Sequence, residues 1–278
     1  MTNRKIVADS SANLMKLRKV PFAAAPLKII AGDREFVDDE TLDLEDMLAH
    51  FSSYKGRSQT SCPNPDDWLR AFGEAEEVYC VAITSGLSGS YNAACIAKEM
   101  YEEAHPGRRV YVIDSLSAGP ELTLMVHKLE ELIVEGKSFE EIEAFMPGYL
   151  KQTGLLFSLE CLNNFAANGR VSLAVAKLAG VLGIRIVGKA SDKGTLAPTD
   201  KCRGEDRSLQ AILTHLKSNG LSTGKVRIAH CMNQAAAKKL KKMILTQIPQ
   251  ADVHIHRCRG LCSYYAEKGG LLIGYEKF

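Results

Sequence analysis

The chain has 278 residues, of which 46% are hydrophobic and 24% are charged, and its formal net charge is +2. This composition is typical of a globular protein with a sizeable core, and the length allows one large domain or two smaller ones. The charges are balanced, there is one Trp, and the Lys and Arg residues are mostly spread out, so we do not expect a nucleic-acid partner.

The sequence also argues against export and against a membrane span. The chain enters an apolar strand at Ile6 without the hydrophobic region of a secretory signal. The most apolar segment, residues 173–187, is interrupted by Lys177 and Arg185, so we do not expect an integral membrane protein. Most of the eight cysteines are isolated within predicted strands or helices, as reduced thiols are. We therefore expect a cytoplasmic protein.

The first half is predicted to alternate short apolar strands with amphipathic helices. The predicted strands cover residues 6–9, 23–30, 34–37, 78–83 and 110–113, and residues 58–62 are extended. The predicted helices cover residues 42–54, 65–72, 92–101, 120–135 and 139–151. Pro65 suits the first position of its helix, because that position needs no N–H donor.

The alternation is interrupted at residues 151–154, and we place a domain boundary there. This divides the chain into an N-terminal domain, residues 1–152, and a C-terminal domain, residues 153–278. In the second half, strands are predicted at residues 155–159, 184–190, 195–199, 225–231, 252–258 and 270–276. Helices are predicted at residues 171–182, 205–218 and 234–247. The fold class predicted is α/β, with two α/β domains.

Three strands of the first half end in similar polar residues. These ends are Asp9-Ser10-Ser11, Thr84-Ser85-Gly86 and Asp114-Ser115. Ligands of α/β sheets bind outside the carboxyl ends of the strands, so the three ends predict one shared site. The alternative is that these residues only form the turns between strands and helices.

The segment from Ser85 to Ser90, Ser-Gly-Leu-Ser-Gly-Ser, joins a strand to a helix. Its glycines allow a tight turn, and free N–H groups at the helix start and serine hydroxyls can bind an anionic oxygen. Ser88 or Ser90 could instead simply cap the helix. A hydrolase nucleophile is a third interpretation, but that signature needs Gly two residues on either side of Ser88, and position 90 is Ser.

Residues of the types that bind metals also cluster near the C-terminus. His254, His256 and Cys258 alternate along one predicted strand, and Cys262 follows closely. Val253 and Ile255 indicate that the opposite face is buried, so the histidines are expected to be solvated. Because the usual paired ligand spacings are missing, no metal is predicted.

Several motifs together resemble those of one known family. They occur in order over essentially the whole chain: Ile6-Val-Ala-Asp9-Ser10-Ser-Ala-Asn-Leu14, Thr60-Ser61-Cys62-Pro63, Ser85-Gly-Leu-Ser88-Gly-Ser90-Tyr-Asn-Ala, Val112-Ile-Asp114-Ser115 and Asn168-Gly169-Arg170-Val-Ser172. No single motif is very specific, but five in this order are. On these residues the chain resembles the DegV family.

The resemblance implies two α/β domains that hold a long-chain fatty acid in a tunnel between them. It implies no catalytic residue and no cofactor. The protein would instead present the acid to a fatty acid kinase, which uses ATP to form the acyl phosphate that enters phospholipid synthesis. Thr60 and Ser88 would hold the carboxylate, and Arg170 would face the kinase or the phosphoryl group. The other residues assigned to ligand binding are Ser61, Ser85, Gly89 and Tyr265.

The chain departs from the family pattern at three places. Cys62 stands where Gln is usual, and Asn168 stands where glycine is frequent. In the C-terminal segment, Tyr264-Tyr265 replaces a Thr-His pair, so that Tyr265 occupies the position of a carboxylate-binding His. A phenol donates a hydrogen bond but is neutral at physiological pH. Two alternatives therefore stay open: a stand-alone serine hydrolase using Ser88, and a carrier or sensor of another amphiphilic acid.

Overall fold

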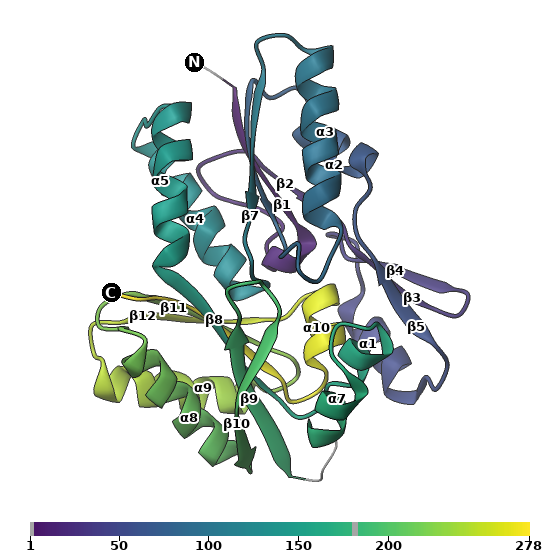
Figure 1. The fold of residues 1–278 in the computed structure, drawn as a ribbon, viewed down its shortest axis with the longest axis vertical. Helices are drawn as coiled ribbons and strands as arrows, with labels where there is room; N and C mark the ends of the chain where they lie inside the picture. The colour runs from purple at the N-terminus through teal and green to yellow at the C-terminus, as the bar shows by residue number, and fades with distance from the viewer. Residues whose placement is uncertain (1–2, 180–182) are drawn as a thin grey trace.

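A parallel sheet forms the core of the first half. The computed structural model describes residues 3–179 and 183–278. In Figure 1 this sheet occupies the upper part of the molecule, and all its neighbouring strands run parallel. Its strands, in spatial order, are β2 (Phe22–Ala25), β1 (Arg4–Asp9), β6 (Glu77–Ala82) and β7 (Arg109–Asp114).

The second half is built on a six-stranded mixed sheet, in which only β11 and β12 pair in parallel. Its strands, in spatial order, are β10 (Leu196–Arg203), β9 (Ile184–Ala190), β8 (Thr153–Leu159), β13 (Leu271–Glu276), β11 (Lys225–His230) and β12 (Asp252–Arg257). The predicted bounds of β9 are confirmed, whereas β10 extends four residues beyond the predicted end.

A third sheet was not anticipated. It is antiparallel, in the order β4 (Arg34–Val37), β3 (Lys28–Ala31) and β5 (Ser58–Ser61). The single strand predicted at residues 23–30 was therefore wrong, because it is divided into β2 and β3, which belong to different sheets. Pro26 lies at the division, where it has no N–H group to donate to a strand ladder.

Helices cover these sheets. They are α1 (Leu44–Ser53), α2 (Pro65–Phe72), α3 (Ser90–Ala104), α4 (Pro120–Val134), α5 (Phe139–Lys151), α6 (Asn163–Ala167), α7 (Leu173–Ala179), α8 (Glu205–Ser218), α9 (Gln234–Gln247) and α10 (Gly260–Ala266), with a 3₁₀ turn η1 at Ser10–Ala12. The predicted bounds of α8 and α9 are confirmed, and α6 and α10 were missed. The helix predicted at residues 171–182 corresponds to α7, which begins two residues later, at Leu173, and residues 180–182 lie outside the described part of the chain.

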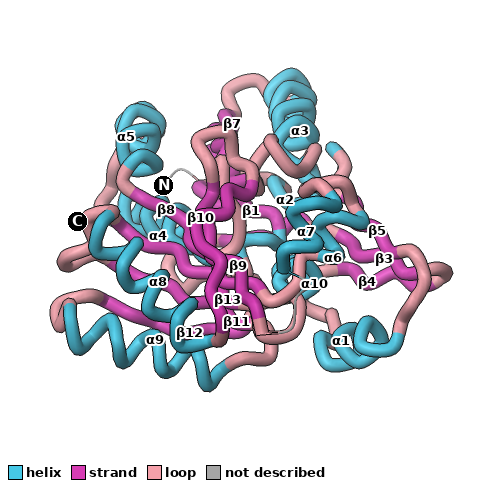
Figure 2. Tube along the Cα trace, turned by 60° about the horizontal axis from the view of Figure 1, so that its bottom comes forward, coloured by secondary structure: helices cyan, strands magenta, loops and turns pink. Residues whose placement is uncertain are grey.

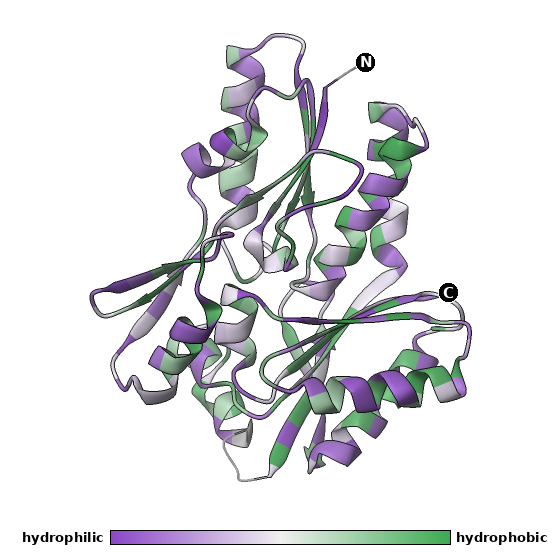
Figure 3. Cartoon of the chain, turned by 180° about the vertical axis from the view of Figure 1, so that it is seen from behind, coloured by the Kyte–Doolittle hydropathy of each residue, from purple (hydrophilic) through white to green (hydrophobic). Residues whose placement is uncertain are grey.

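Helices α8 and α9 lie together along one face of the six-stranded sheet (Figure 2). Both are amphipathic, so each alternates purple and green in Figure 3 and buries its apolar side against the sheet. The buried side chains they contribute include Leu209, Ile212, Leu240 and Ile244. This packing supplies the core of the second half.

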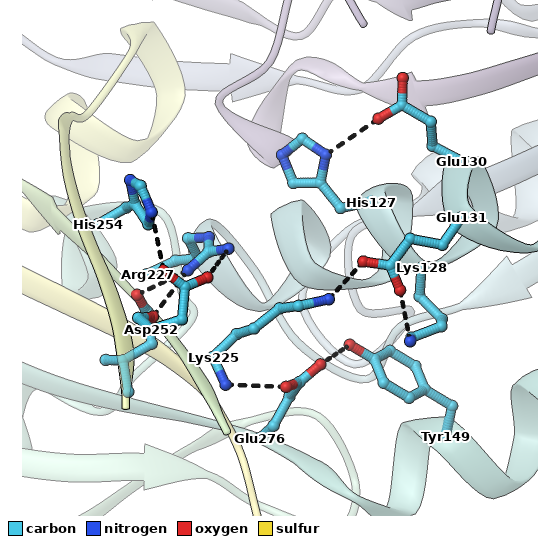
Figure 4. Close-up of polar contacts among 11 residues, drawn as sticks. His127, Lys128, Glu130, Glu131, Tyr149, Lys225, Arg227, Asp252, His254 and Glu276 are labelled. Carbon is cyan, nitrogen blue, oxygen red and sulfur yellow. Dashed lines mark hydrogen bonds and ion pairs between the residues drawn. The ribbon is translucent and has the colours of Figure 1, made fainter. Parts of the chain in front are cut away.

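Helix α4 connects the two main sheets. It contacts β1 and β6 of the first sheet and also β8, β11 and β13 of the second. Polar contacts hold this region, as Figure 4 shows: Lys225 pairs with Glu131 of α4, and the Tyr149 hydroxyl of α5 donates to Glu276 of β13 at 2.7 Å. None of the helices formed by described residues is long and apolar enough to cross a membrane.

Candidate functional site

The polar ends of the first-half strands meet in the folded structure. The Asp9 carboxylate at the end of β1 is fully buried and accepts hydrogen bonds from the Ile83 N–H at 2.7 Å and the Ser90 hydroxyl at 2.7 Å. Burial raises the pKa of Asp9, and these donors oppose that shift. Asp114 at the end of β7 accepts from the Ser85 N–H at 3.1 Å. The two aspartates thus hold the segment between β6 and α3 in place.

Ser88 in this segment has a hydroxyl available for a ligand. Helix α3 begins at Ser90 with Gly89 at the capping position, and no side chain caps it there. The Ser88 Oγ accepts a hydrogen bond from the Ser90 N–H at 3.2 Å. A hydroxyl that accepts in this way still has its own hydrogen to donate. Ser88 therefore both orders the helix start and keeps a donor.

A cavity of about 290 Å³ lies beside this segment, and both halves of the chain contribute to its wall. Its apolar lining comes mainly from Leu27, Ile83, Leu87, Ala118, Leu155, Phe157, Leu159, Phe165, Ala190, Leu196, Leu261, Ala266 and Leu272. Its polar lining comes from Thr60, Ser61, Thr84, Ser88, Ser117, Arg170, Thr195 and Tyr265, with two thiols, Cys62 and Cys262. An apolar cavity with a few polar groups suits an amphiphilic ligand.

Thr60 and Tyr265 form a hydroxyl pair at the cavity wall. The Thr60 Oγ1 of β5 lies 2.8 Å from the Tyr265 Oη of α10. The ring of Tyr265 packs on Phe165, with 4.6 Å between ring centroids. Burial raises the pKa of Tyr265, although the nearby Thr60 hydroxyl and Arg170 guanidinium oppose the shift. The phenol is therefore neutral, and the pair has one hydroxyl hydrogen left for a ligand.

Arg170 brings a positive charge to the same cavity. Its Nε donates to the Leu87 carbonyl at 3.2 Å, and its Nη1 donates to the Asn168 carbonyl. Leu87 belongs to the segment before α3, so the guanidinium joins the two halves of the chain. The resemblance implies that Arg170 faces the kinase or the phosphoryl group; in the structure Arg170 lines the same cavity as Ser88.

The tip of the hairpin between β9 and β10 closes the wall near Thr84. Gly194 approaches so closely that a Cβ atom built on it would lie 1.9 Å from the Thr84 Oγ1. A Cβ on Gly86 would lie 2.5 Å from the Lys193 carbonyl oxygen. Only glycines allow this contact. The glycine in the predicted hairpin turn was the signal that could have pointed to a close approach.

Six of the seven predicted site residues line the cavity, and one does not. Those that do are Thr60, Ser61, Ser88, Gly89, Arg170 and Tyr265. The prediction that Ser85 binds the ligand is corrected. Its side chain is exposed and is not among the lining residues, and its N–H is turned toward Asp114. Thr84, which belongs to one of the three strand ends predicted to share a site, also lines the cavity, as do Ser117 and Thr195.

The C-terminal histidines do not take part in this site. His254 is exposed and pairs with Asp252 at 2.8 Å (Figure 4). His256 was expected to be solvated, but it is half-buried, and burial lowers its pKa to about 4. In the described part of the chain, no group of three or more His, Cys, Asp or Glu side chains is arranged to hold a metal ion. All eight cysteines are free thiols.

Comparison with known families accounts for the whole chain. The model described as "Uncharacterised protein, DegV family" matches residues 3–277. The chain belongs to the DegV family. A DegV domain-containing protein of Streptococcus pneumoniae is 43% identical over 276 residues, which are 98% of each chain. A DegV domain-containing protein of Streptococcus pyogenes serotype M1 is 40% identical over 276 residues, or 98% of this chain and 99% of that protein.

Solved DegV structures share the fold over its full length. The Streptococcus pneumoniae Fatty Acid Kinase (Fak) B3 protein, loaded with linoleic acid, has a TM-score of 0.98 and 43% identity, with 100% of each chain covered. A DegV family protein from Eubacterium eligens, loaded with heptadecanoic acid, has a TM-score of 0.97 and 44% identity, covering 99% of this chain and 100% of that chain. The predicted DegV-like α/β fold is confirmed.

Proposed function

We propose that this protein binds a long-chain fatty acid and presents its carboxylate to a fatty acid kinase. The observation that carries the proposal is the apolar cavity whose polar wall combines the hydroxyls of Thr60, Ser88 and Tyr265 with the Arg170 guanidinium. Relatives at 43–44% identity over essentially the whole chain are loaded with fatty acids, which supports the same ligand class here. The acid would lie between the two proposed domains, residues 1–152 and 153–278.

The chemistry of the wall suits an acyl chain and its carboxylate. Each CH₂ group transferred from water into the apolar part contributes about 0.8 kcal/mol. Hydroxyl and guanidinium donors form charge-assisted hydrogen bonds with a carboxylate, which are stronger than bonds between neutral groups. A fatty acid would therefore be retained by its chain and oriented by its head group.

In the proposed reaction the protein is not itself the catalyst. The kinase transfers the terminal phosphoryl group of ATP to a carboxylate oxygen of the bound acid, forming acyl phosphate and releasing ADP. The B3 relative carries the name of a fatty acid kinase system, which supports this partner. Such a kinase works on cytoplasmic ATP, so the proposal also places the protein in the cytoplasm.

The residues that line the cavity include no histidine that could activate Ser88, so a stand-alone hydrolase is not favoured.

The ligand itself can be identified by mass spectrometry. Protein purified from a bacterial host without added lipid should release long-chain fatty acids when it is denatured, and delipidated protein should bind oleate or palmitate. A panel of other amphiphilic acids tests whether the head group or the chain decides affinity. Absence of acyl chains from the purified protein, together with no binding of added acids, would contradict the proposal.

The site is tested by removing its hydroxyls. The pair of substitutions Thr60→Val and Ser88→Ala should lower fatty acid affinity at least about tenfold, because each hydroxyl bonds a charged group. Ser85→Ala is the matched control, since Ser85 belongs to the same segment but lies outside the cavity. Unchanged affinity in the double variant would place the carboxylate elsewhere. Reaction of Ser88 with a fluorophosphonate would instead favour the hydrolase.

A further inference from the structure

The side chain of Asn168, just before the Gly169-Arg170 pair, is held by two hydrogen bonds. Its amide nitrogen donates to the Asn164 carbonyl at 2.9 Å and to the Tyr264 Oη at 2.9 Å. Both N–H hydrogens of the amide can therefore be used. These bonds fasten the loop after α6 to helix α10, although about a hundred residues separate Asn168 from Tyr264.

Tyr264 is itself held from two sides, so it provides a rigid attachment point. Its side chain is 2% exposed. Its Oη lies 2.7 Å from the Ser58 Oγ of β5, and its carbonyl accepts from the Asn164 Nδ2 at 2.7 Å. Strand β5 also carries Thr60, which contacts the neighbouring Tyr265. The two adjacent tyrosines therefore bind to two hydroxyls of the same strand.

The Asn168 main chain in turn holds Arg170. Its carbonyl accepts from Arg170 Nη1, while the Leu87 carbonyl accepts from Arg170 Nε. Gly169, between them, has a φ of +71°, which lets the chain turn back within one residue. These two bonds occupy two of the five N–H donors of the guanidinium and leave others for a ligand in the cavity. An arginine held in advance loses less conformational freedom when it binds an anion.

We propose that Asn168 and Tyr264 are positioning residues that hold the Arg170 guanidinium at the cavity wall, and that they thereby make the site select carboxylate lipids over neutral ones. The inference rests on the proposed function, since it concerns the head group of the same ligand.

The test compares two ligands that differ in head group charge. Oleic acid and oleyl alcohol, bound to delipidated full-length protein, give an acid-over-alcohol ratio of affinities. Asn168→Ala and Tyr264→Phe should each lower this ratio about threefold to tenfold, the value of one hydrogen bond. The double variant should lose little more than the larger single change, because both substitutions remove the same bond. In protein that already carries Arg170→Gln, neither Asn168→Ala nor Tyr264→Phe should lower the acid-over-alcohol ratio further.

The control and the contrary results separate this inference from simple loosening of the fold. Asn163→Ala, which changes an exposed residue of the short helix α6 that precedes Asn168, should keep the wild-type ratio. A loosened cavity would weaken the binding of acid and of alcohol equally, and that result overturns the inference. An acid-over-alcohol ratio that is unchanged in both Asn168→Ala and Tyr264→Phe also overturns it. If Tyr264→Phe does not fold, the acid-over-alcohol ratio of Asn168→Ala decides the test by itself. If wild-type protein binds neither ligand, the proposed function fails as well.

Discussion

At the scale of single residues, burial decides which groups are charged. Tyr265 is a phenol and is neutral at physiological pH, and burial raises its pKa further, so its bond to Thr60 does not change across the physiological pH range. A histidine in that place would become charged in mild acid.

Glu121 of α4 is also buried, and it accepts hydrogen bonds from the Ser117 Oγ and from the Thr153 Oγ1 at 2.7 Å. Burial is the largest effect on Glu121, and it raises the pKa.

A raised carboxyl pKa makes stability depend on pH. The folded protein holds the Glu121 proton more tightly than the unfolded chain does. The resulting stabilisation is full below the unfolded pKa of about 4.3 and is lost as the pH rises through the folded value. We expect the free energy of unfolding of Glu121→Gln, relative to wild type, to increase from pH 4 to pH 8. Urea unfolding at several pH values measures this.

The control for this prediction is Glu135→Gln, which changes an exposed glutamate directly after the same helix. Its free energy of unfolding should keep a nearly constant difference from wild type over the pH range. A constant difference for Glu121→Gln as well would mean that this carboxyl has the same proton affinity in the folded and unfolded states.

At the scale of elements, α10 depends on a residue far away in the sequence. The helix has seven residues, too few to be stable alone. Its first N–H groups, those of Gly260 and Leu261, donate to the Asp38 carboxylate at 3.0 and 2.9 Å. Gly260 leaves room for that carboxylate, because a Cβ there would lie 2.7 Å from the Asp38 Cγ. Asp38 thus positions the helix that carries Tyr265.

Removing this distant cap should weaken both the fold and the site. Asp38→Ala leaves buried N–H groups unpaired, so we expect the free energy of unfolding to fall by about 1–3 kcal/mol. Fatty acid affinity should fall too, because Tyr265 moves with α10. Thermal unfolding and binding titration check both effects, with the exposed turn residue Asp33→Ala as control. Equal stability of the Asp38 and Asp33 variants would show that α10 needs no such cap.

At the scale of the whole molecule, the cavity exists only because two halves of the chain meet. The hairpin tip at Gly194 lies against Thr84, Arg170 reaches the Leu87 carbonyl, and α4 packs on both main sheets. These contacts enclose an apolar space that neither half encloses alone. Retention of a ligand should therefore depend on the contact at the hairpin tip.

Gly194→Ala tests this contact against a matched glycine. Gly194 has a φ of +69° and a Cβ would collide with Thr84, whereas Gly204 has a φ of +85° and open space around it. We expect Gly204→Ala to cost only backbone strain, about 1–3 kcal/mol, because its φ of 85° and ψ of 163° lie in a region that is almost exclusive to glycine. Gly194→Ala should cost more and should also speed fatty acid dissociation, measured by stopped-flow transfer to an acceptor protein. Similar dissociation rates for the two variants would contradict a closing role for the tip.

The local pattern by itself determined much of this protein. Helices α8 and α9 and strand β9 have the predicted bounds, because periodicity and end signals are local properties of the chain. The ordered motifs identified the DegV family, and with it Thr60 and Ser88. Both residues line the cavity.

Only the tertiary structure decided the rest, because the deciding contacts join distant residues. Asp38 caps a helix 222 residues away, and Asn168 binds Tyr264 across 96 residues, so no local pattern reveals either bond. No local pattern reveals the position of Arg170 either, because its place in the cavity wall depends on a hydrogen bond to the distant Leu87 carbonyl. Ser85 and Ser88 look alike in the sequence, yet one is exposed and the other lines the cavity. Which side chain faces a ligand is set by how the segment is held, and here Asp9 and Asp114 hold it.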